Sequence, residues 1–204
     1  MSATLVAGDD DPYRLPAPTP DSPVVLDRWI SPDNHHPNSR YRDEVWSLAP
    51  LIDNPATSLV SIHWKNSPAE VHDQLKMIAW ATINGELRPS YLRTRAVAAR
   101  SRMGAAELVM TCHEWMIMAQ WLVERGIRSL SDCSSDDYTA YAAHRGSDAT
   151  RTYMERVLGR LTDLWAYDQL TAHPAGVPQP PLGSRGFGRL PARRAGRQRG
   201  GERN

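Results

Sequence analysis

The sequence has few cysteines and no long apolar run, and each shortage excludes a class of protein. Only two cysteines occur among the 204 residues, Cys112 and Cys133, and they form no Cys-x-x-Cys pair. A disulfide framework or a zinc site is therefore not expected. No stretch approaches the roughly 20 apolar residues that a membrane-spanning helix needs, and the N-terminus lacks the pattern of a signal peptide. We expect a soluble, cytoplasmic protein with no membrane partner.

Net charge is also small, at +1, and the arginines are unevenly distributed. Residues 183–204 contain seven arginines and one acidic residue, which leaves the first 182 residues slightly acidic. An argument for a nucleic-acid partner must therefore rest on where the arginines lie rather than on the total charge.

Sequence motifs for catalysis, metal binding and nucleotide binding are missing. Seven histidines occur, but none is spaced as His-x-x-x-His or His-Glu-x-x-His. His113 and Glu114 are neighbours that point in different directions on a helix, so we interpret them as a surface pair rather than a ligand set. The glycines around Phe187 do not stand between a strand and a helix, as a phosphate-binding loop requires. We predict no metal, no cofactor and no small-molecule substrate.

Composition divides the chain into four ranges. Residues 1–40 are rich in Pro, Asp, Ser and Asn and are predicted to form a flexible N-terminal arm. Residues 41–89 are predicted to form an N-terminal helical layer, residues 90–172 a helical domain, and residues 173–204 a disordered basic tail. No segment alternates as a strand does, and residues 59–62 are too short to decide. The predicted fold is all-α, a small bundle of about five helices.

Periodicity and capping residues indicate where these helices begin and end. A hydroxyl cap and a proline at Ser67–Pro68 start the first helix, and Asn84–Gly85 is predicted to stop it in the left-handed conformation. The third helix follows the 3.6-residue apolar period over residues 105–123 and ends at Gly126. Ser134 and Asp137 form a capping pattern for a short fourth helix, and a fifth helix spans about residues 148–170.

The second helix, after Pro89, has a buried stripe flanked by two rows of arginine. Arg93 and Arg100 form one row, and Arg88, Arg95 and Arg102 form the other; neighbours in a row are seven residues apart and share a helical face. Residues 88–102 contain five arginines and no acidic residue, whereas a surface that is merely solvated usually mixes basic and acidic residues. Guanidinium groups on both flanks suit a phosphate backbone. The residues alone leave this interpretation and that of solvated surface arginines about even.

Three runs of the sequence follow one another in a characteristic order: AWATINGELRPSYLRTR, QWLVERGIRSLSDCSSDDYTAYAAHR and RVLGRLTDLWAYDQL. They contain a long helix, a turn at Gly126–Ile127, a step at Leu130–Asp132, and a short helix with Tyr138 and Tyr141. This order, over about residues 41–181, resembles the N-terminal portion of actinobacterial tyrosine recombinases and phage integrases. The resemblance implies a SAM-like core-binding domain, which in this family precedes the catalytic domain and clamps one side of the DNA duplex.

The chain departs from this family because it lacks the catalytic domain. After Leu170 only 34 residues remain; they contain no tyrosine, and no His-x-x-Arg motif occurs anywhere. We assign no catalytic residue and predict that the chain is not an enzyme. An ending rich in Arg, Gly and Pro is what a shifted reading frame would produce, so we expect a truncated, non-catalytic module of a protein for DNA integration and recombination.

Two functions remain open from the sequence. In the first, the helices over residues 90–103 and 105–125 meet double-stranded DNA. Its candidate DNA-binding residues are Arg88, Arg93, Arg95, Arg100 and Arg102. The second is a helical protein–protein interaction module without DNA binding, which buries an apolar stripe against a partner, another recombinase subunit or its own copy. A steep salt dependence of binding separates the two.

Overall fold

The computed structural model of the chain describes residues 11–54, 58, 60–94, 102–146 and 151–180. This part of the chain forms five α-helices: α1 (His72–Asn84), α2 (Pro89–Thr94), α3 (Ala105–Glu124), α4 (Ser135–Gly146) and α5 (Arg151–Asp168). It also forms two short strands, β1 (Val45–Ser47) and β2 (Ser61–His63). The fold is therefore mostly helical, as predicted, but it is not strictly all-α because the two strands pair.

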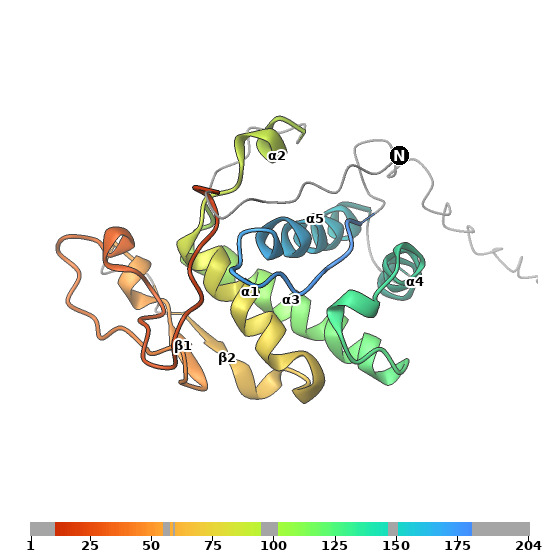
Figure 1. Ribbon diagram of the computed structural model, residues 1–204, viewed down its shortest axis with the longest axis horizontal. Coiled ribbons are helices and arrows are strands. Elements are labelled where there is room, and N and C mark those ends of the chain that lie inside the picture. The colour runs from red at the N-terminus through yellow and green to blue at the C-terminus, as the bar shows by residue number, and fades with distance from the viewer. Residues whose placement is uncertain (1–10, 55–57, 59, 95–101, 147–150, 181–204) are drawn as a thin grey trace, which may run out of the picture.

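Helix α1 lies at the centre of the helical body, and α3 and α5 pack against it (Figure 1). Nine of its 13 residues are buried, so it is enclosed on almost all sides. Trp115 of α3 is also buried, and its Nε1 donates a hydrogen bond to the carbonyl of Arg160 on α5 at 2.7 Å. One cluster of buried hydrophobic residues runs from Leu15 to Val177. The described parts of residues 41–89 and 90–172 thus share a single core.

Residues 11–40 are packed against the helices, which corrects the prediction of a flexible arm for this part of the chain; residues 1–10 lie outside the described residues. Val24 and Val25 are fully buried, and the backbone N–H of Leu15 donates to the carbonyl of Leu170 at 2.8 Å. Composition did not reveal this order because the segment lacks periodic apolar residues of its own. It is held instead by hydrogen bonds to a distant helix end.

Asn84, the last residue of α1, makes most of these bonds. Its side chain is fully buried; Oδ1 accepts from the N–H of Leu26 at 2.9 Å, and Nδ2 donates to the carbonyls of Val24 at 2.9 Å and Trp80 at 3.0 Å. Its own carbonyl accepts from Nη2 of Arg28 and Nε1 of Trp29, both at 2.9 Å. Asn84 therefore joins the N-terminal segment to the core.

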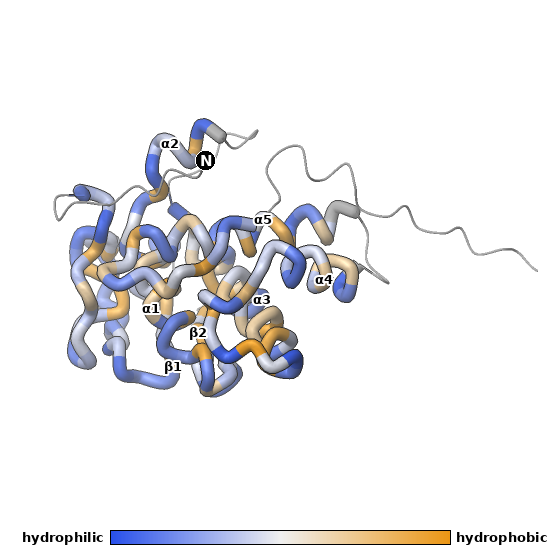
Figure 2. The backbone as a smooth tube through the Cα atoms, turned by 45° about the vertical axis from the view of Figure 1, so that its right-hand side comes forward, coloured by the Kyte–Doolittle hydropathy of each residue, from blue (hydrophilic) through white to orange (hydrophobic). Residues whose placement is uncertain are grey.

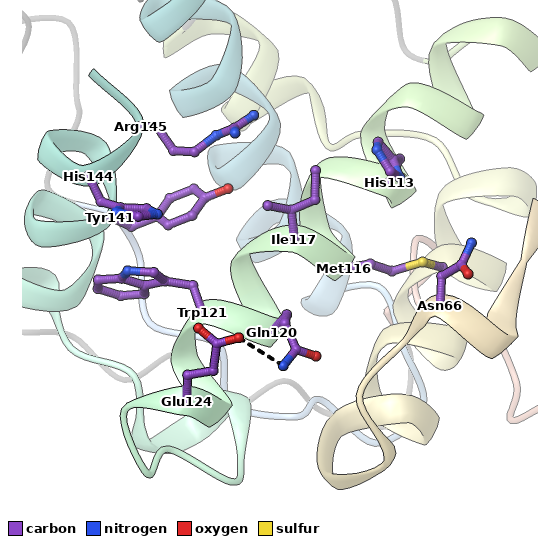
Figure 3. A pocket seen from close by; sticks show the side chains of 10 residues that line it. All are labelled: Asn66, His113, Met116, Ile117, Gln120, Trp121, Glu124, Tyr141, His144 and Arg145. Atoms are coloured by element: carbon purple, nitrogen blue, oxygen red, sulfur yellow. Dashed lines mark hydrogen bonds between the residues drawn. The ribbon is translucent and has the colours of Figure 1, made fainter. Parts of the chain in front are cut away.

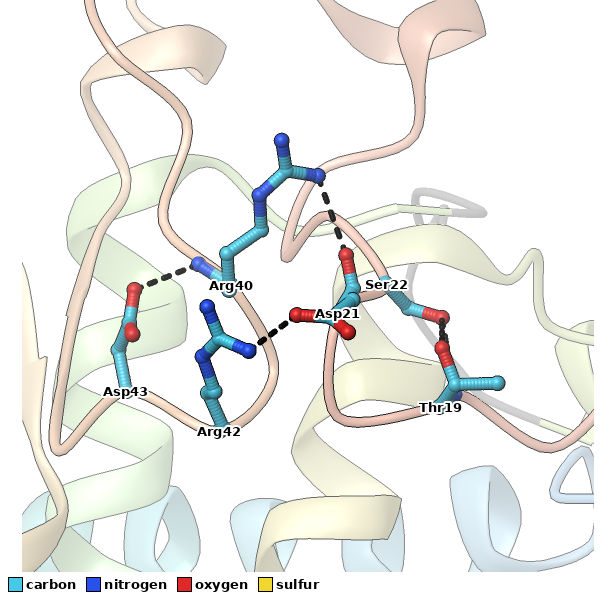
Figure 4. Close-up of polar contacts among 6 residues, drawn as sticks. All are labelled: Thr19, Asp21, Ser22, Arg40, Arg42 and Asp43. Atoms are coloured by element: carbon cyan, nitrogen blue, oxygen red, sulfur yellow. Dashed lines mark hydrogen bonds and ion pairs between the residues drawn. The ribbon is translucent and has the colours of Figure 1, made fainter.

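Two loops of the N-terminal segment are tied together at the surface (Figure 4). Nη1 of Arg40 donates to the carbonyl of Asp21 at 3.1 Å, and Arg42 pairs with the Asp21 carboxylate. The N–H of Arg40 donates to Oδ2 of Asp43 at 2.7 Å, which closes the second loop. These exposed contacts position the segment and add little free energy of their own.

The strands β1 and β2 form an antiparallel pair with Trp46 opposite Ile62. Both of these residues are buried, whereas Val45 and His63, which are also opposite each other, are exposed. This is the alternation of a strand with one covered face, compressed into three residues, and it is too short to be visible in the sequence. Lys76 of α1 lies against this hairpin, with its Nζ 5.6 Å from the ring centroid of Trp46.

Some predicted helix ends are confirmed. Gly126 follows α3 with φ of 87°, the left-handed stop that was expected. At the start of α4, the N–H of Ser134 donates to Oδ2 of Asp137 at 2.8 Å, and the N–H of Asp137 donates to Oγ of Ser134 at 3.2 Å. These reciprocal bonds are the predicted capping pattern.

The ends predicted for the first helix are wrong in detail. The hydroxyl of Ser67 does not cap it, because a 3₁₀ turn at Ala69–Val71 comes first and α1 begins at His72. Gly85 is extended, with φ of −95°, rather than left-handed. A Cβ at this position would lie 2.7 Å from the carbonyl oxygen of Ala81, so glycine is needed here for close approach and not for a positive φ.

Residues 173–180, predicted as part of a disordered tail, fold back on the body; residues 181–204 lie outside the described residues. The buried carboxylate of Asp168, at the end of α5, accepts from the N–H groups of Ala175 at 2.7 Å, Gly176 at 3.1 Å and Val177 at 3.0 Å. The prolines of this range do prevent further helix, as predicted, but Asp168 supplies the hydrogen bonds that order it.

Candidate functional site

Arg102, a predicted DNA-binding residue, is bound into the fold beside the end of α1. Its Nη2 donates to the carbonyl of Ile83 at 2.9 Å, and its guanidinium carbon lies 3.4 Å from the ring centroid of Trp29. Burial is the largest influence on this group and lowers the pKa of Arg102. A cation beside the last carbonyls of a helix is favourable for the helix dipole. Arg102 therefore stabilises the end of α1, and a phosphate contact would require it to leave these partners.

Arg88 is also held by partners within the chain. Its guanidinium pairs with the carboxylate of Asp11 and donates to the carbonyl of Gln169 at 3.4 Å. It thereby ties the N-terminal segment and the end of α5 to the start of α2. Arg88 and Arg102 mark the two ends of the arginine-rich segment and anchor both to the body.

Of the three predicted site residues that the structure describes, Arg93 is the one that faces solvent. It is exposed on α2 and makes no hydrogen bond or ion pair with any residue of the described ranges. Helix α2 stands at the edge of the molecule, away from α4, in both Figure 1 and Figure 2. Tyr91 holds it there, because its ring lies 5.9 Å from that of Trp165 and its hydroxyl donates to Asp163 Oδ1 at 3.3 Å.

Arg95 and Arg100 lie outside the described residues. The helix expected over residues 90–103 is not continuous to its end, because α2 is Pro89–Thr94 and residues 102–104 are not helical. The two arginine rows were inferred from a seven-residue spacing, which places side chains on one face only while a helix continues. The structure therefore does not place Arg102 on one helical face with Arg88, as the predicted row of Arg88, Arg95 and Arg102 required.

A groove of about 330 Å³ between α3 and α4 is a second candidate site (Figure 3). Its lining combines imidazole, guanidinium, amide and aromatic groups. The residues are Asn66, His113, Met116, Ile117, Gln120, Trp121, Glu124, Tyr141, His144 and Arg145. Rings from both helices meet in it: the Trp121 and Tyr141 centroids are 5.5 Å apart in an edge-to-face arrangement. A surface of this mixed chemistry suits a partner that offers both apolar and polar groups.

A buried polar network lies beside the groove. Glu114 is only 3% exposed; its Oε1 accepts from the hydroxyl of Tyr141 at 2.6 Å, and its Oε2 lies 3.4 Å from Nη2 of Arg145. Arg145 also contacts the hydroxyl of Tyr153 on α5. The network thus joins α3, α4 and α5 with a charge that is paired rather than isolated.

The sequence analysis interpreted His113 and Glu114 as a surface pair, and this is wrong for Glu114. His113 is exposed, but Glu114 is on the covered side of α3. The signal was present in the spacing, because the buried residues Thr111 and Met118 stand three positions before and four positions after Glu114.

The buried Tyr138 and Tyr141 and the half-buried Tyr41 lead to a prediction for alkaline pH. Burial, the largest cause, raises the pKa of Tyr41 to about 12. Burial also raises the pKa values of Tyr138 and Tyr141, and the hydrogen bond and negative charge of Glu114 raise that of Tyr141 further. Because the folded state holds these protons more tightly than the unfolded chain, the free energy of unfolding should fall as the pH rises above 10. Urea unfolding at pH 8, 10 and 11 checks this.

The variant Tyr141→Phe removes one of these ionisable groups. Its stability should therefore fall less steeply above pH 10 than that of the wild type. Equal slopes for Tyr141→Phe and the wild type would contradict the assignment.

Comparison with family models, with curated proteins and with solved structures gave no match. Within the described ranges, no group of three or more His, Cys, Asp or Glu side chains is placed to hold a metal ion. No helix in the same part of the chain is long and apolar enough to cross a membrane.

Proposed function

We propose that this chain is a cytoplasmic, non-catalytic DNA-binding module of the tyrosine-recombinase core-binding type, and that the segment starting at α2 contacts the phosphates of duplex DNA. The observation that carries the proposal is that this segment is anchored to the body at both ends and exposes an arginine on α2. Arg88 and Arg102 anchor its two ends in the body, and Arg93 stands exposed between them with no ion-pair partner among the residues that the structure describes. An exposed arginine without an acidic partner is free to bind phosphate.

The order of elements supports the same class of protein. Four elements follow one another in the order on which the family resemblance rests: the long helix α3, the turn at Gly126, the 3₁₀ step at Leu130–Asp132 and the short helix α4. Tyr138 and Tyr141 of α4 are both buried, and we assign neither a catalytic role. Phosphate contacts from such a segment give affinity with little preference for DNA sequence.

The test is binding of a fluorescent DNA duplex to the full chain at several salt concentrations. The variant with Arg93, Arg95 and Arg100 changed to alanine should bind at least about tenfold more weakly at low salt. The slope of log affinity against log salt should become shallower by about 2 to 3, because each lost phosphate contact removes about one unit.

A matched control keeps the change of charge constant. Changing Arg40, Arg128 and Arg156, which are exposed elsewhere, to alanine removes the same number of charges and leaves the C-terminal arginines in place. This variant should retain affinity within about threefold. Equal losses in the two variants would reduce the effect to general charge and overturn the proposal, and the absence of salt-dependent binding in the wild type would favour the interaction module.

A further inference from the structure

The N-terminal segment brings a carboxylate to the arginine-rich segment. Residues 88–102 contain five arginines and no acidic residue, so an acidic partner must come from elsewhere in the chain. Asp11 supplies one from 77 positions away, because its carboxylate pairs with the guanidinium of Arg88. Figure 1 shows the start of the described chain, in red, beside the connection that leads from α1 into α2. The pair therefore lies where the proposed DNA-binding segment begins.

The two carboxylate oxygens of Asp11 have separate partners. Oδ2 accepts from Nη2 of Arg88, and Oδ1 accepts from the N–H of Tyr13 at 3.1 Å, so the local turn holds the carboxylate in place. The side chain of Asp11 is only 10% exposed, and salt therefore screens this pair less than a pair at the open surface. The Tyr13 ring centroid lies 6.0 Å from the guanidinium carbon of Arg88 and adds a cation–π contact.

Arg88 can still be reached by an anion from solvent. Its side chain is 34% exposed. A guanidinium has five N–H donors; here Nη2 serves Asp11 and the carbonyl of Gln169, and Nε is buried without a hydrogen-bond partner among the described residues. Carboxylates and phosphates bind guanidinium groups by the same charge-assisted hydrogen bonds. Asp11 and a DNA phosphate therefore compete for the charge of Arg88.

We propose that Asp11 is an internal substitute for a phosphate, which neutralises Arg88 and thereby lowers the affinity of the chain for duplex DNA. This inference rests on the proposed function and concerns the regulation of the same site. Arg93 follows Arg88 by five residues, a rise of roughly 7.5 Å along a helix, which is within the Debye length of about 8 Å at physiological salt. The negative charge of Asp11 therefore weakens the attraction of phosphate to Arg93 as well as to Arg88.

The variant Asp11→Asn removes the charge and keeps the turn. The side-chain oxygen of asparagine can still accept from the N–H of Tyr13, whereas its NH₂ group cannot accept from Arg88. In titrations of a fluorescent duplex with the full chain, this variant should bind about three- to tenfold more tightly than the wild type at low salt. The slope of log affinity against log salt should become steeper by about one, because one more positive charge is available to phosphate.

Two further variants show whether the gain comes from Arg88. Asp21→Asn is the matched control, because Asp21 also pairs with an arginine of the N-terminal segment, Arg42, and it should bind within about twofold of the wild type. The double variant Asp11→Asn, Arg88→Gln should lose the gain and return to within about twofold of the wild type. Tighter binding that persists in the double variant comes from loosening of the N-terminal segment and overturns the proposal.

Failure of this inference can be told apart from failure of the proposed function. If the wild type shows no salt-dependent binding, the DNA-binding function itself fails and the role of Asp11 fails with it. If the wild type binds and the variant with Arg93, Arg95 and Arg100 changed to alanine binds more weakly, but Asp11→Asn binds like the wild type, only the inhibitory role of Asp11 is overturned. Equal gains for Asp11→Asn and Asp21→Asn overturn it as well, because the effect is then one of general charge.

Discussion

Changing Asn84 to aspartate is expected to lower the free energy of unfolding by about 3 to 5 kcal/mol, the range for an uncompensated buried charge. The amide nitrogen of Asn84 donates to the carbonyls of Val24 and Trp80, and an aspartate would point a carboxylate oxygen at both. The position is fully buried, so water cannot restore the lost partners. The N-terminal segment should be released from the end of α1.

Urea unfolding followed by tryptophan fluorescence measures the loss, and limited proteolysis reports the release of residues 11–40. Asn66→Asp makes the same chemical change at an exposed position and should alter stability by no more than about 0.5 kcal/mol. If Asn84→Asp were as stable as Asn66→Asp, the side chain of Asn84 would not hold the segment.

The second large effect is expected at Asp168. Burial raises the pKa of this carboxyl, and the N–H groups of Ala175, Val177 and Gly176 offset part of that rise. Changing Asp168 to alanine leaves three backbone donors without their acceptor and should destabilise the protein by about 3 kcal/mol. Asp168→Asn should also be destabilising, because its amide can offer one oxygen only and turns an NH₂ group toward a donor.

Hydrogen exchange at Ala175, Gly176 and Val177 measures this directly, since these amides should lose protection in both variants. Asp33→Ala removes an exposed carboxylate and serves as the control. Retention of protection in Asp168→Ala would show that the loop is held by its other contacts, such as the bond from the Tyr138 hydroxyl to the carbonyl of Pro178.

Local chemistry was sufficient to predict the features that depend on neighbouring residues. The apolar period of α3, the left-handed Gly126 and the reciprocal bonds of Ser134 and Asp137 each involve residues within a few positions of one another. These features can be predicted because they depend on the local sequence and not on tertiary contacts.

Features set by distant partners could not be predicted. The N–H of Leu26 and the side chain of Asn84 form a hydrogen bond although they are 58 positions apart in the sequence. No sequence pattern near either residue predicts this bond. Gly85 was assigned a left-handed turn because that is the usual reason for glycine after a helix, whereas here its reason is the nearby Leu170 side chain and Ala81 carbonyl.

The sequence indicated which segment holds the candidate arginines, but it did not indicate how these arginines are arranged in space. The lack of acidic residues between Arg88 and Arg102 drew attention to this segment, but the spacing argument assumed one unbroken helix. Arg102 is instead bound by Ile83 and Trp29. The α3–α4 groove escaped notice because its walls come from two helices whose relative placement depends on the buried Glu114, Tyr141 and Arg145.

The contacts of residues 11–15 also constrain how the chain folds during synthesis. Leu15 bonds to Leu170, and Asp11 pairs with Arg88, so this segment is synthesised before its partners and finds all of them only after α5 has been synthesised. Until then Val24 and Val25 have no completed core to enter. Contacts of such long sequence separation form late and slow the folding of a domain. The N-terminal segment is thus translated before the helices that hold it, and it is locked in place only after them.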